Sequence, residues 1–99
     1  MKVLTGIVTF NPSINRLREN LDTIKTHETD LLLFDNGSDN YKDIEELASD
    51  AGCVVHRVSE NQGTAYGLRH IMEYAARNHY DWVLSLDQDS IRAAESNMG

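Results

Sequence analysis

The feature that most constrains the fold of this chain is a regular alternation of short apolar runs and amphipathic stretches. Runs rich in apolar and β-branched residues are typical of strands that are covered on both faces of a parallel sheet. The stretches between them repeat apolar residues every three or four positions, which predicts helices. We therefore expect strands over residues 3–10, 31–34, 53–58 and 82–86, with one helix between each pair of neighbours. Repeated crossovers of this kind favour a three-layer α/β fold with a parallel sheet.

Each predicted helix has one apolar side. Residues typical of helix starts or ends flank the first two helices. Asn11 and Pro12 suit the beginning of the first helix, as a cap and as a residue whose missing N–H costs nothing there. Asn40 suits the beginning of the second helix and Gly52 its end. The third helix is expected over residues 64–78. The predicted inward residues are Ile14, Leu17, Leu21 and Ile24, then Ile44, Leu47, Ala48 and Ala51, and finally Ala65, Leu68, Ile71, Met72 and Ala75.

The charge and the cysteine content of the chain argue against several classes of protein. The chain has 99 residues, enough for one small domain. Its net charge of −7 disfavours binding to nucleic acid or to an anionic membrane surface. The single cysteine, Cys53, excludes an internal disulfide and indicates a reducing, cytoplasmic compartment, with Cys53 as a small buried hydrophobe. The longest purely apolar run, residues 31–34, is far too short for a membrane span.

Polar residues gather where the predicted strands end. In parallel α/β sheets, ligands bind outside the carboxyl ends of the strands. In this chain those ends are residues 9–11, 35–39, 59–63 and 87–90, and each segment contains Asn, Ser or Thr. We therefore expect a ligand with hydroxyl groups, a base or a metal at this edge of the sheet.

Asp87 and Asp89 are the strongest chemical signal. Two carboxylates one residue apart, just past a buried strand, can converge on one hard divalent cation such as Mg²⁺ or Mn²⁺. A metal there would neutralise a diphosphate and help it leave. The same residues also suit an ordinary solvated turn, and the pattern alone does not decide between the two.

Two other turns carry weaker signals. Asp35, at a strand tip, could accept hydrogen bonds from a base or a ribose, and Gly37 permits a tight turn with positive φ. Asn61 and Gly63 open the third helix, where free N–H groups favour an anion and a residue without a side chain lets a flat ligand come close. Taken one at a time, each of these turns is explained more simply as an ordinary capped helix start.

Taken together, four segments resemble the N-terminal half of the family 2 glycosyltransferases, which have the GT-A fold. Residues 7–12 (IVTFNP) resemble the opening strand and turn of that family, and residues 34–38 (FDNGS) resemble its D-N-G-S turn. Residues 60–65 (ENQGTA) resemble its E-N-x-G-x-A segment, and residues 86–90 (LDQDS) resemble its D-x-D metal motif. The four segments follow one another in the order and spacing of the family, which makes the combination specific.

The resemblance implies a Rossmann-like parallel sheet of the GT-A type and a sugar transfer. The donor would be a nucleotide-diphosphate-sugar and the acceptor a saccharide or lipid-linked acceptor, as in polysaccharide biosynthesis. The reaction would be an inverting displacement assisted by a divalent metal, Mn²⁺ or Mg²⁺. The L-D-Q-D-S and N-Q-G sequences are similar to the rhamnosyltransferase branch, which implies a dTDP-sugar such as dTDP-rhamnose.

The same resemblance implies roles for individual residues. Thr9 and Asn11 would border the nucleotide pocket, and Asp35 would read the base. Asp87 would reach the ribose or the metal, and Asp89 would ligate the metal. The implied nucleotide-sugar-binding residues are Thr9, Asn11, Asp35, Asn61, Gly63 and Asp87, and the implied metal ligands are Asp87 and Asp89.

Two departures from the family pattern bear on function. Where the family usually carries Asn, or Arg beside it, after the N-x-G-x-A segment, this chain has Leu68, Arg69 and His70. Family members also continue past the D-x-D motif into acceptor-binding strands and a catalytic carboxylate, whereas this sequence ends at Gly99. We therefore expect a single, incomplete nucleotide-sugar-binding domain over residues 1–99, truncated after the fourth strand and without the catalytic base. The sheet edge left uncovered would allow a homo-oligomer to form.

Two other functions compete with sugar transfer. A non-catalytic nucleotide-binding or interaction module would carry the same turns without any turnover. Residues 86–90 also have the h-D-x-D shape of haloacid-dehalogenase-like phosphatases. In that family, however, the motif lies on the first strand of the core, whereas three predicted strands precede it here.

Overall fold

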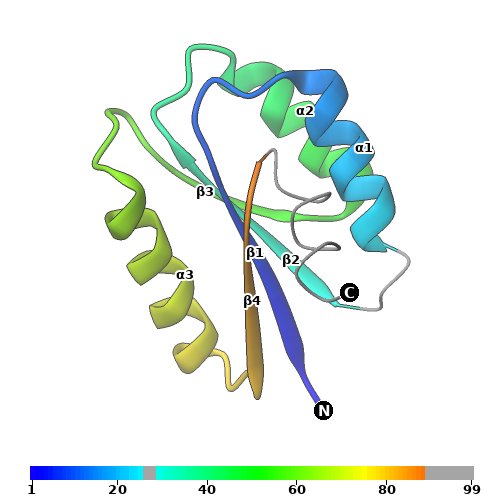
Figure 1. The fold of residues 1–99 in the computed structure, drawn as a ribbon, viewed down its shortest axis with the longest axis vertical. Helices are drawn as coiled ribbons and strands as arrows, with labels where there is room; N and C mark the ends of the chain where they lie inside the picture. Colours follow the sequence, from blue (N-terminus) through cyan, green and yellow to red (C-terminus); the bar gives the residue numbers. More distant parts are fainter. Residues whose placement is uncertain (26–28, 89–99) are drawn as a thin grey trace.

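The computed structural model describes residues 1–25 and 29–88, and within them it confirms the predicted alternation of strands and helices (Figure 1). The strands are β1 (Val3–Thr9), β2 (Asp30–Asn36), β3 (Val54–Val58) and β4 (Trp82–Asp87). The helices are α1 (Ile14–Lys25), α2 (Tyr41–Ala51) and α3 (Thr64–Arg77). In the described residues, no helix is long and apolar enough to cross a membrane.

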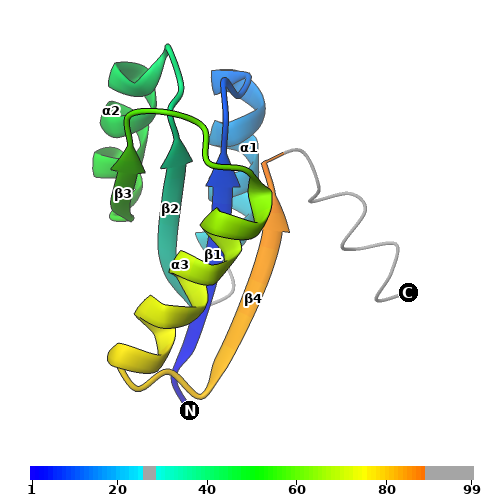
Figure 2. The same cartoon turned by 90° about the vertical axis from the view of Figure 1, so that its left-hand side faces the viewer.

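The strands form one all-parallel sheet in the order β3-β2-β1-β4. Helices α1 and α2 cover one face of the sheet and α3 crosses the other, so the chain has the predicted three-layer, Rossmann-like α/β fold (Figures 1 and 2). The strand order reverses at β1, with β2 and β3 on one side and β4 on the other. In open parallel sheets, ligands bind outside the carboxyl ends of the strands at such a reversal. The topology therefore directs attention to the ends of β1 and β4.

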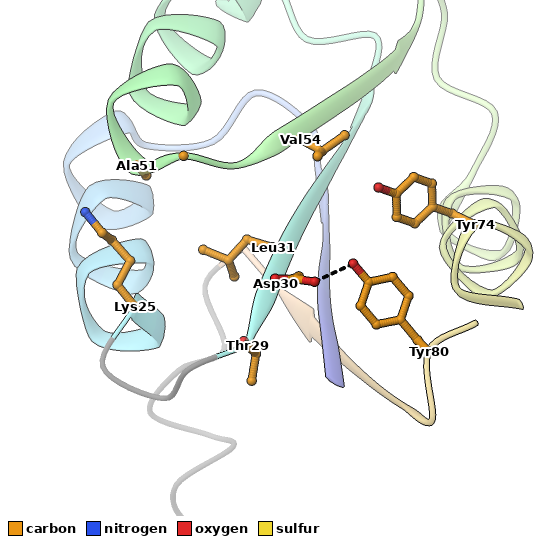
Figure 3. A pocket seen from close by; sticks show the side chains of 9 residues that line it. Lys25, Thr29, Asp30, Leu31, Ala51, Val54, Tyr74 and Tyr80 are labelled. Atoms are coloured by element: carbon orange, nitrogen blue, oxygen red, sulfur yellow. Dashed lines mark hydrogen bonds between the residues drawn. The ribbon is translucent and has the colours of Figure 1, made fainter. Parts of the chain in front are cut away.

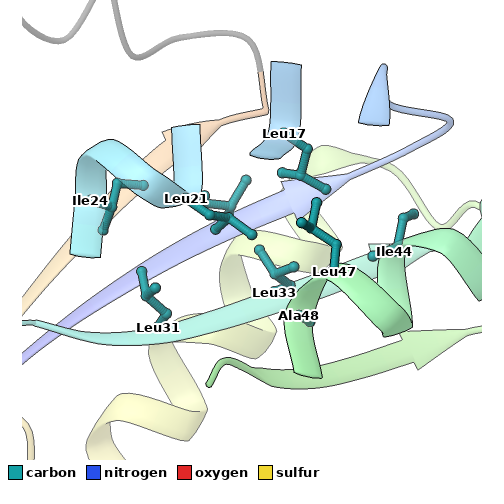
Figure 4. Packing of buried hydrophobic residues seen from close by; sticks show 9 residues of the cluster. Leu17, Leu21, Ile24, Leu31, Leu33, Ile44, Leu47 and Ala48 are labelled. Atoms are coloured by element: carbon teal, nitrogen blue, oxygen red, sulfur yellow. The ribbon is translucent and has the colours of Figure 1, made fainter. Parts of the chain in front are cut away.

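The larger core lies between the sheet and helices α1 and α2 (Figure 4). Each fully buried Leu or Ile in it contributes about 1.5–3 kcal/mol to folding. The inward sides predicted for the first two helices are confirmed, and Ile14 and Ala51 pack against the core while partly buried. This α1/α2-side core consists of Ile7, Leu17, Leu21, Ile24, Leu31, Leu33, Ile44, Leu47 and Ala48.

The predicted start and end positions are correct for α2, whereas α1 begins later than Asn11 and Pro12 suggest. Gly52 ends α2 in the left-handed conformation (φ 73°), which glycine adopts without steric strain. Asn40 precedes α2 as predicted, but its side chain donates to the carbonyl of Pro12 and does not cap the helix. Ser13 caps α1, because its hydroxyl accepts a hydrogen bond from an N–H of the first turn (3.4 Å). Asn11 does not cap α1, since its side chain binds a different loop.

The smaller core lies between the sheet and α3 and corrects the prediction for the third helix. Ile71 and Ala75 are buried as predicted, but Ala65, Leu68 and Met72 are exposed. The buried side of α3 begins instead at Gly67, four residues before Ile71. Because glycine has no apolar side chain, it leaves no hydrophobic signal, and the sequence pattern places the inward side at neighbouring positions. This α3-side core consists of Leu4, Leu32, Phe34, Ile71 and Ala75.

Strand β4 forms one edge of the sheet and carries exposed apolar side chains. Trp82 and Leu84 are 62% and 52% exposed. They alternate onto the same face as Leu86, which packs against the α1/α2-side core. An edge strand with uncovered apolar side chains can pair with another chain. Self-association through this edge stays a prediction.

Two neighbouring residues of α3 test the corrected inward side. We expect Ile71→Val to lower the free energy of unfolding by about 0.5–1.5 kcal/mol, because it removes a buried methyl group. Met72→Ala should change it by less than about 0.5 kcal/mol, because that side chain is 57% exposed. Urea denaturation followed by circular dichroism measures both changes. A larger loss for Met72→Ala than for Ile71→Val would contradict the corrected side.

Candidate functional site

A buried carboxylate organises the loops that follow the strands, residues 10–13, 37–40, 59–63 and 88, which together we call the carboxyl edge. Asp35, near the end of β2, has no exposed surface. Its oxygens accept hydrogen bonds from the hydroxyl of Thr9 (2.8 Å) and from the backbone N–H (3.0 Å) and hydroxyl (2.6 Å) of Ser38. A carboxylate removed from water needs such donors to offset its lost hydration. Asp35 thereby joins β1 to the turn that follows β2.

Ser38 and Asn11 extend this network to the loop after β1. The N–H of Asn11 donates to the hydroxyl of Ser38 (2.8 Å), and the side-chain oxygen of Asn11 accepts from the N–H of Asp39 (2.8 Å). Asn11 has a positive φ of 43°, a conformation that Asn adopts more readily than most residues. The side chain of Asn40 donates to the carbonyl of Pro12 (2.9 Å). The loops after β1 and β2 are therefore held together by side chains.

Asn36 connects the turn after β2 to the loop after β3. Its side-chain amide donates to the carbonyl of Gly63 (2.9 Å), and its side-chain oxygen accepts from the N–H of Gln62 (2.9 Å). Gly37 allows the two segments to touch, because its φ is 84° and an added Cβ would lie 2.8 Å from the carbonyl carbon of Glu60. Each residue of the D-N-G-S turn thus makes a different structural contact.

The loop after β4 is fixed by Gln88, the middle residue of the D-Q-D segment. Its side-chain oxygen accepts from the N–H of Phe10 (2.8 Å), and its side-chain amide donates to the carbonyl of Phe10 (3.1 Å). The buried Asn20 of α1 donates its side-chain amide to the carbonyl of Gln88. The loops after β1 and β4 therefore meet where the strand order reverses.

The predicted metal ligands cannot be placed in the same way. The side chain of Asp87 and the whole of Asp89 lie outside the described residues. Within the described part of the chain, no three His, Cys, Asp or Glu side chains are positioned to hold a metal ion. The metal site at Asp87 and Asp89 stays a prediction.

The predicted nucleotide-binding residues lie in or beside the carboxyl edge but differ in accessibility. Thr9 and Asp35 are fully buried and bonded to each other, so neither offers a free polar group to a ligand in this conformation. Asn11, Asn61 and Gly63 are exposed, and Asn61 accepts a hydrogen bond from the N–H of Gly63 (2.7 Å). A direct base contact by Asp35 would require one of its present partners to move.

Sequence reasoning missed two residues beside this edge, Tyr41 and Arg57. Arg57 pairs in register with Asp35, and its guanidinium carbon lies 4.0 Å from the centroid of the Tyr41 ring. Burial, followed by the nearby Glu45, raises the pKa of the half-buried Tyr41. The alternation of side chains along β3 could have placed Arg57 near the end of the strand, on the same face as Val55 two residues earlier. The contact with Tyr41 could not be found in this way, because it depends on where α2 begins in space.

Below the carboxyl edge, a histidine pair joins α3 to the sheet. Nδ1 of His56 on β3 and Nε2 of His70 on α3 are 2.7 Å apart and share a hydrogen bond. The ring of His70 also packs on Phe34, with ring centroids 4.5 Å apart. Burial, and then the neighbouring His56, lower the pKa of His70. The shared hydrogen bond needs at least one neutral imidazole, because two protonated rings offer only donors.

A separate cavity of about 330 Å³ lies at the opposite end of the sheet, at the start of β2 (Figure 3). The hydroxyl of Tyr80 donates to the carboxylate of Asp30 (2.6 Å), and Lys25 and Tyr74 line other parts of the wall. Burial and the hydrogen bond to Asp30 raise the pKa of Tyr80 to about 12. None of the predicted site residues lines this cavity, so it is distinct from the carboxyl edge.

In comparisons with known proteins, no family model, no curated protein and no solved structure matches this chain.

Two glycines with positive φ test the contact between the D-N-G-S turn and the loop after β3. Gly37 (φ 84°) and Gly52 (φ 73°) would both incur backbone strain on substitution, but only at Gly37 would a new methyl group meet backbone atoms. We expect Gly37→Ala to lower the free energy of unfolding by at least about 1 kcal/mol more than Gly52→Ala. Urea denaturation of the two variants measures the difference, and equal losses would show that the contact is unimportant.

The histidine pair predicts a pH-dependent stability. Because the pKa of His70 is lowered on folding, the unfolded chain binds a proton more readily than the folded one. The contribution of neutral His70 to the free energy of unfolding is therefore complete above about pH 6.5. It is lost as the pH falls through the pKa of His70 in the folded chain. His70→Gln should flatten the decrease of Tm between about pH 7 and pH 5, measured by calorimetry. His79→Asn, at an exposed position, should keep the wild-type slope. The same slope in all three proteins would contradict this role.

Proposed function

We propose that this chain binds the donor of a glycosyltransferase reaction, a nucleoside-diphosphate sugar, at the carboxyl edge. The observation that supports the proposal is that the four loops resembling family 2 glycosyltransferases are joined at one edge of a parallel sheet. Asp35, Asn36 and Gln88 make the connections between these loops. The reversal of strand order at β1 makes the same edge the expected ligand crevice.

The proposed reaction is displacement of a nucleoside diphosphate by a hydroxyl group of a saccharide or lipid-linked acceptor, with inversion at the sugar. Two carboxylates, Asp87 and Asp89, on either side of the anchored Gln88 suit Mg²⁺ or Mn²⁺, which prefer oxygen ligands. When bound, such an ion would offset the charge of the diphosphate. No base for the acceptor hydroxyl is identified among the described residues, so the proposal for this chain is donor binding.

Two finer assignments belong to the same proposal. A dTDP-sugar as donor, as in rhamnosyltransferases, rests on the L-D-Q-D-S and N-Q-G sequences. A cytoplasmic location rests on the single cysteine, Cys53, which is half-buried and packs against the α1/α2-side core. Burial raises the pKa of its thiol to about 11, so the thiol stays protonated and unreactive at neutral pH.

Calorimetric titration of UDP and dTDP, with and without Mn²⁺, tests the proposal. We expect Mn²⁺ to tighten binding by about tenfold or more, because Asp89 would help to hold an ion whose charge offsets that of the diphosphate. Asp89→Ala should remove this metal dependence. Asp50→Ala, which removes an exposed carboxylate from the last turn of α2, should retain it. Equal affinity with and without Mn²⁺, or unchanged metal dependence in Asp89→Ala, would contradict the assignment.

A further inference from the structure

Three residues form a row across the sheet beside the carboxyl edge. Thr9 of β1 pairs in register with Asp35 of β2, and Asp35 pairs in register with Arg57 of β3. All three lie on the face covered by α1 and α2. Each comes two residues after a side chain that belongs to that core or packs against it, namely Ile7, Leu33 and Val55. A ligand that lies along the row from β1 reaches Arg57 last.

Accessibility distinguishes the members of this row. Thr9 and Asp35 have no exposed surface and satisfy each other, whereas Arg57 is exposed. In the described part of the chain, no carboxylate forms an ion pair with Arg57, which instead lies over the Tyr41 ring. A guanidinium lying over an aromatic ring keeps its N–H groups free to donate in its own plane. Arg57 is therefore the member of the row that can bind a ligand without any rearrangement.

The distance across the sheet indicates which part of the donor Arg57 would meet. Neighbouring strands lie about 4.8 Å apart, so β3 and β4 are separated by about 14 Å. In the proposed function, the diphosphate lies near the end of β4, where the D-Q-D segment begins. The nucleoside then extends across β1 and β2 toward β3, with its base at the far end.

We propose that Arg57, held in place by Tyr41, selects the base of the donor by donating a hydrogen bond to the carbonyl oxygen at position 4 of its ring. This inference rests on the proposed function and names its specificity-determining residue. Arginine has only donors, so at this position it favours uracil and thymine, which present a carbonyl oxygen where cytosine presents an amino group. The buried Asp35 then supports the site from behind and does not itself contact the base.

Titrations of UDP, CDP and pyrophosphate in the presence of Mn²⁺ test this assignment. The wild-type chain should bind UDP about tenfold more tightly than CDP, and Arg57→Ala should reduce this ratio to about one without weakening pyrophosphate. Arg57→Lys should lose most of the selectivity, because an ammonium does not stack on the Tyr41 ring as the planar guanidinium does, so its donors are not held in place. Tyr41→Leu should act in the same direction, whereas Tyr41→Phe, which keeps the ring, should bind like the wild type.

Arg77→Ala is the matched control, since it removes an exposed arginine from the far end of α3. Unchanged UDP/CDP selectivity in Arg57→Ala would overturn the inference, and so would an equal loss of UDP, CDP and pyrophosphate binding. In either case, Mn²⁺-dependent binding of UDP by the wild-type chain would leave the proposed function standing. If the wild-type chain binds no nucleotide at all, both proposals fail.

Discussion

The burial of one carboxylate is the constraint on which the carboxyl edge depends. A charged group with no exposed surface is tolerated only while its oxygens keep their hydrogen-bond donors. For Asp35 these donors come from Thr9 on β1 and from Ser38 in its own turn. Ser38 in turn accepts from the backbone of Asn11. The loops after β1 and β2 therefore cannot move independently without exposing the Asp35 carboxylate to water or leaving it buried without hydrogen-bond donors.

The architecture could be predicted from the sequence because the two kinds of periodicity differ clearly. Continuous apolar runs and helical stripes alternate along the chain, and they predict both the strands and the parallel sheet. The predicted inward side is wrong for α3, because Gly67 occupies a buried position there. A glycine there brings the helix close to Val8 and Phe34, at 2.8 Å and 3.1 Å from an added Cβ. Hydrophobic patterning cannot detect a contact that depends on the lack of a side chain.

The candidate site could be located from the sequence, but the task of each residue could not. The ends of the predicted strands place the candidate residues beside one edge of the sheet, because parallel strands all end on the same side, and the structure joins the loops there. The resemblance predicts that Asp35 reads a base, whereas the structure shows it buried and bonded to Thr9 and Ser38, so a base contact by Asp35 stays a prediction. The contact of Arg57 with Tyr41 joins residues of β3 and α2, so it follows from tertiary packing and not from any local pattern.

The central position of β1 has a consequence for how the chain folds. β1 is the first strand in the sequence, yet one of its two neighbours is β4, the last. The contact between Lys2 and Asp81 at the start of this pair joins residues 79 positions apart. Closing so long a segment costs entropy before any contact repays it, and sequence-distant pairing slows folding. As the chain leaves the ribosome, β1 therefore keeps one hydrogen-bonding edge open until nearly all of the described residues have been made.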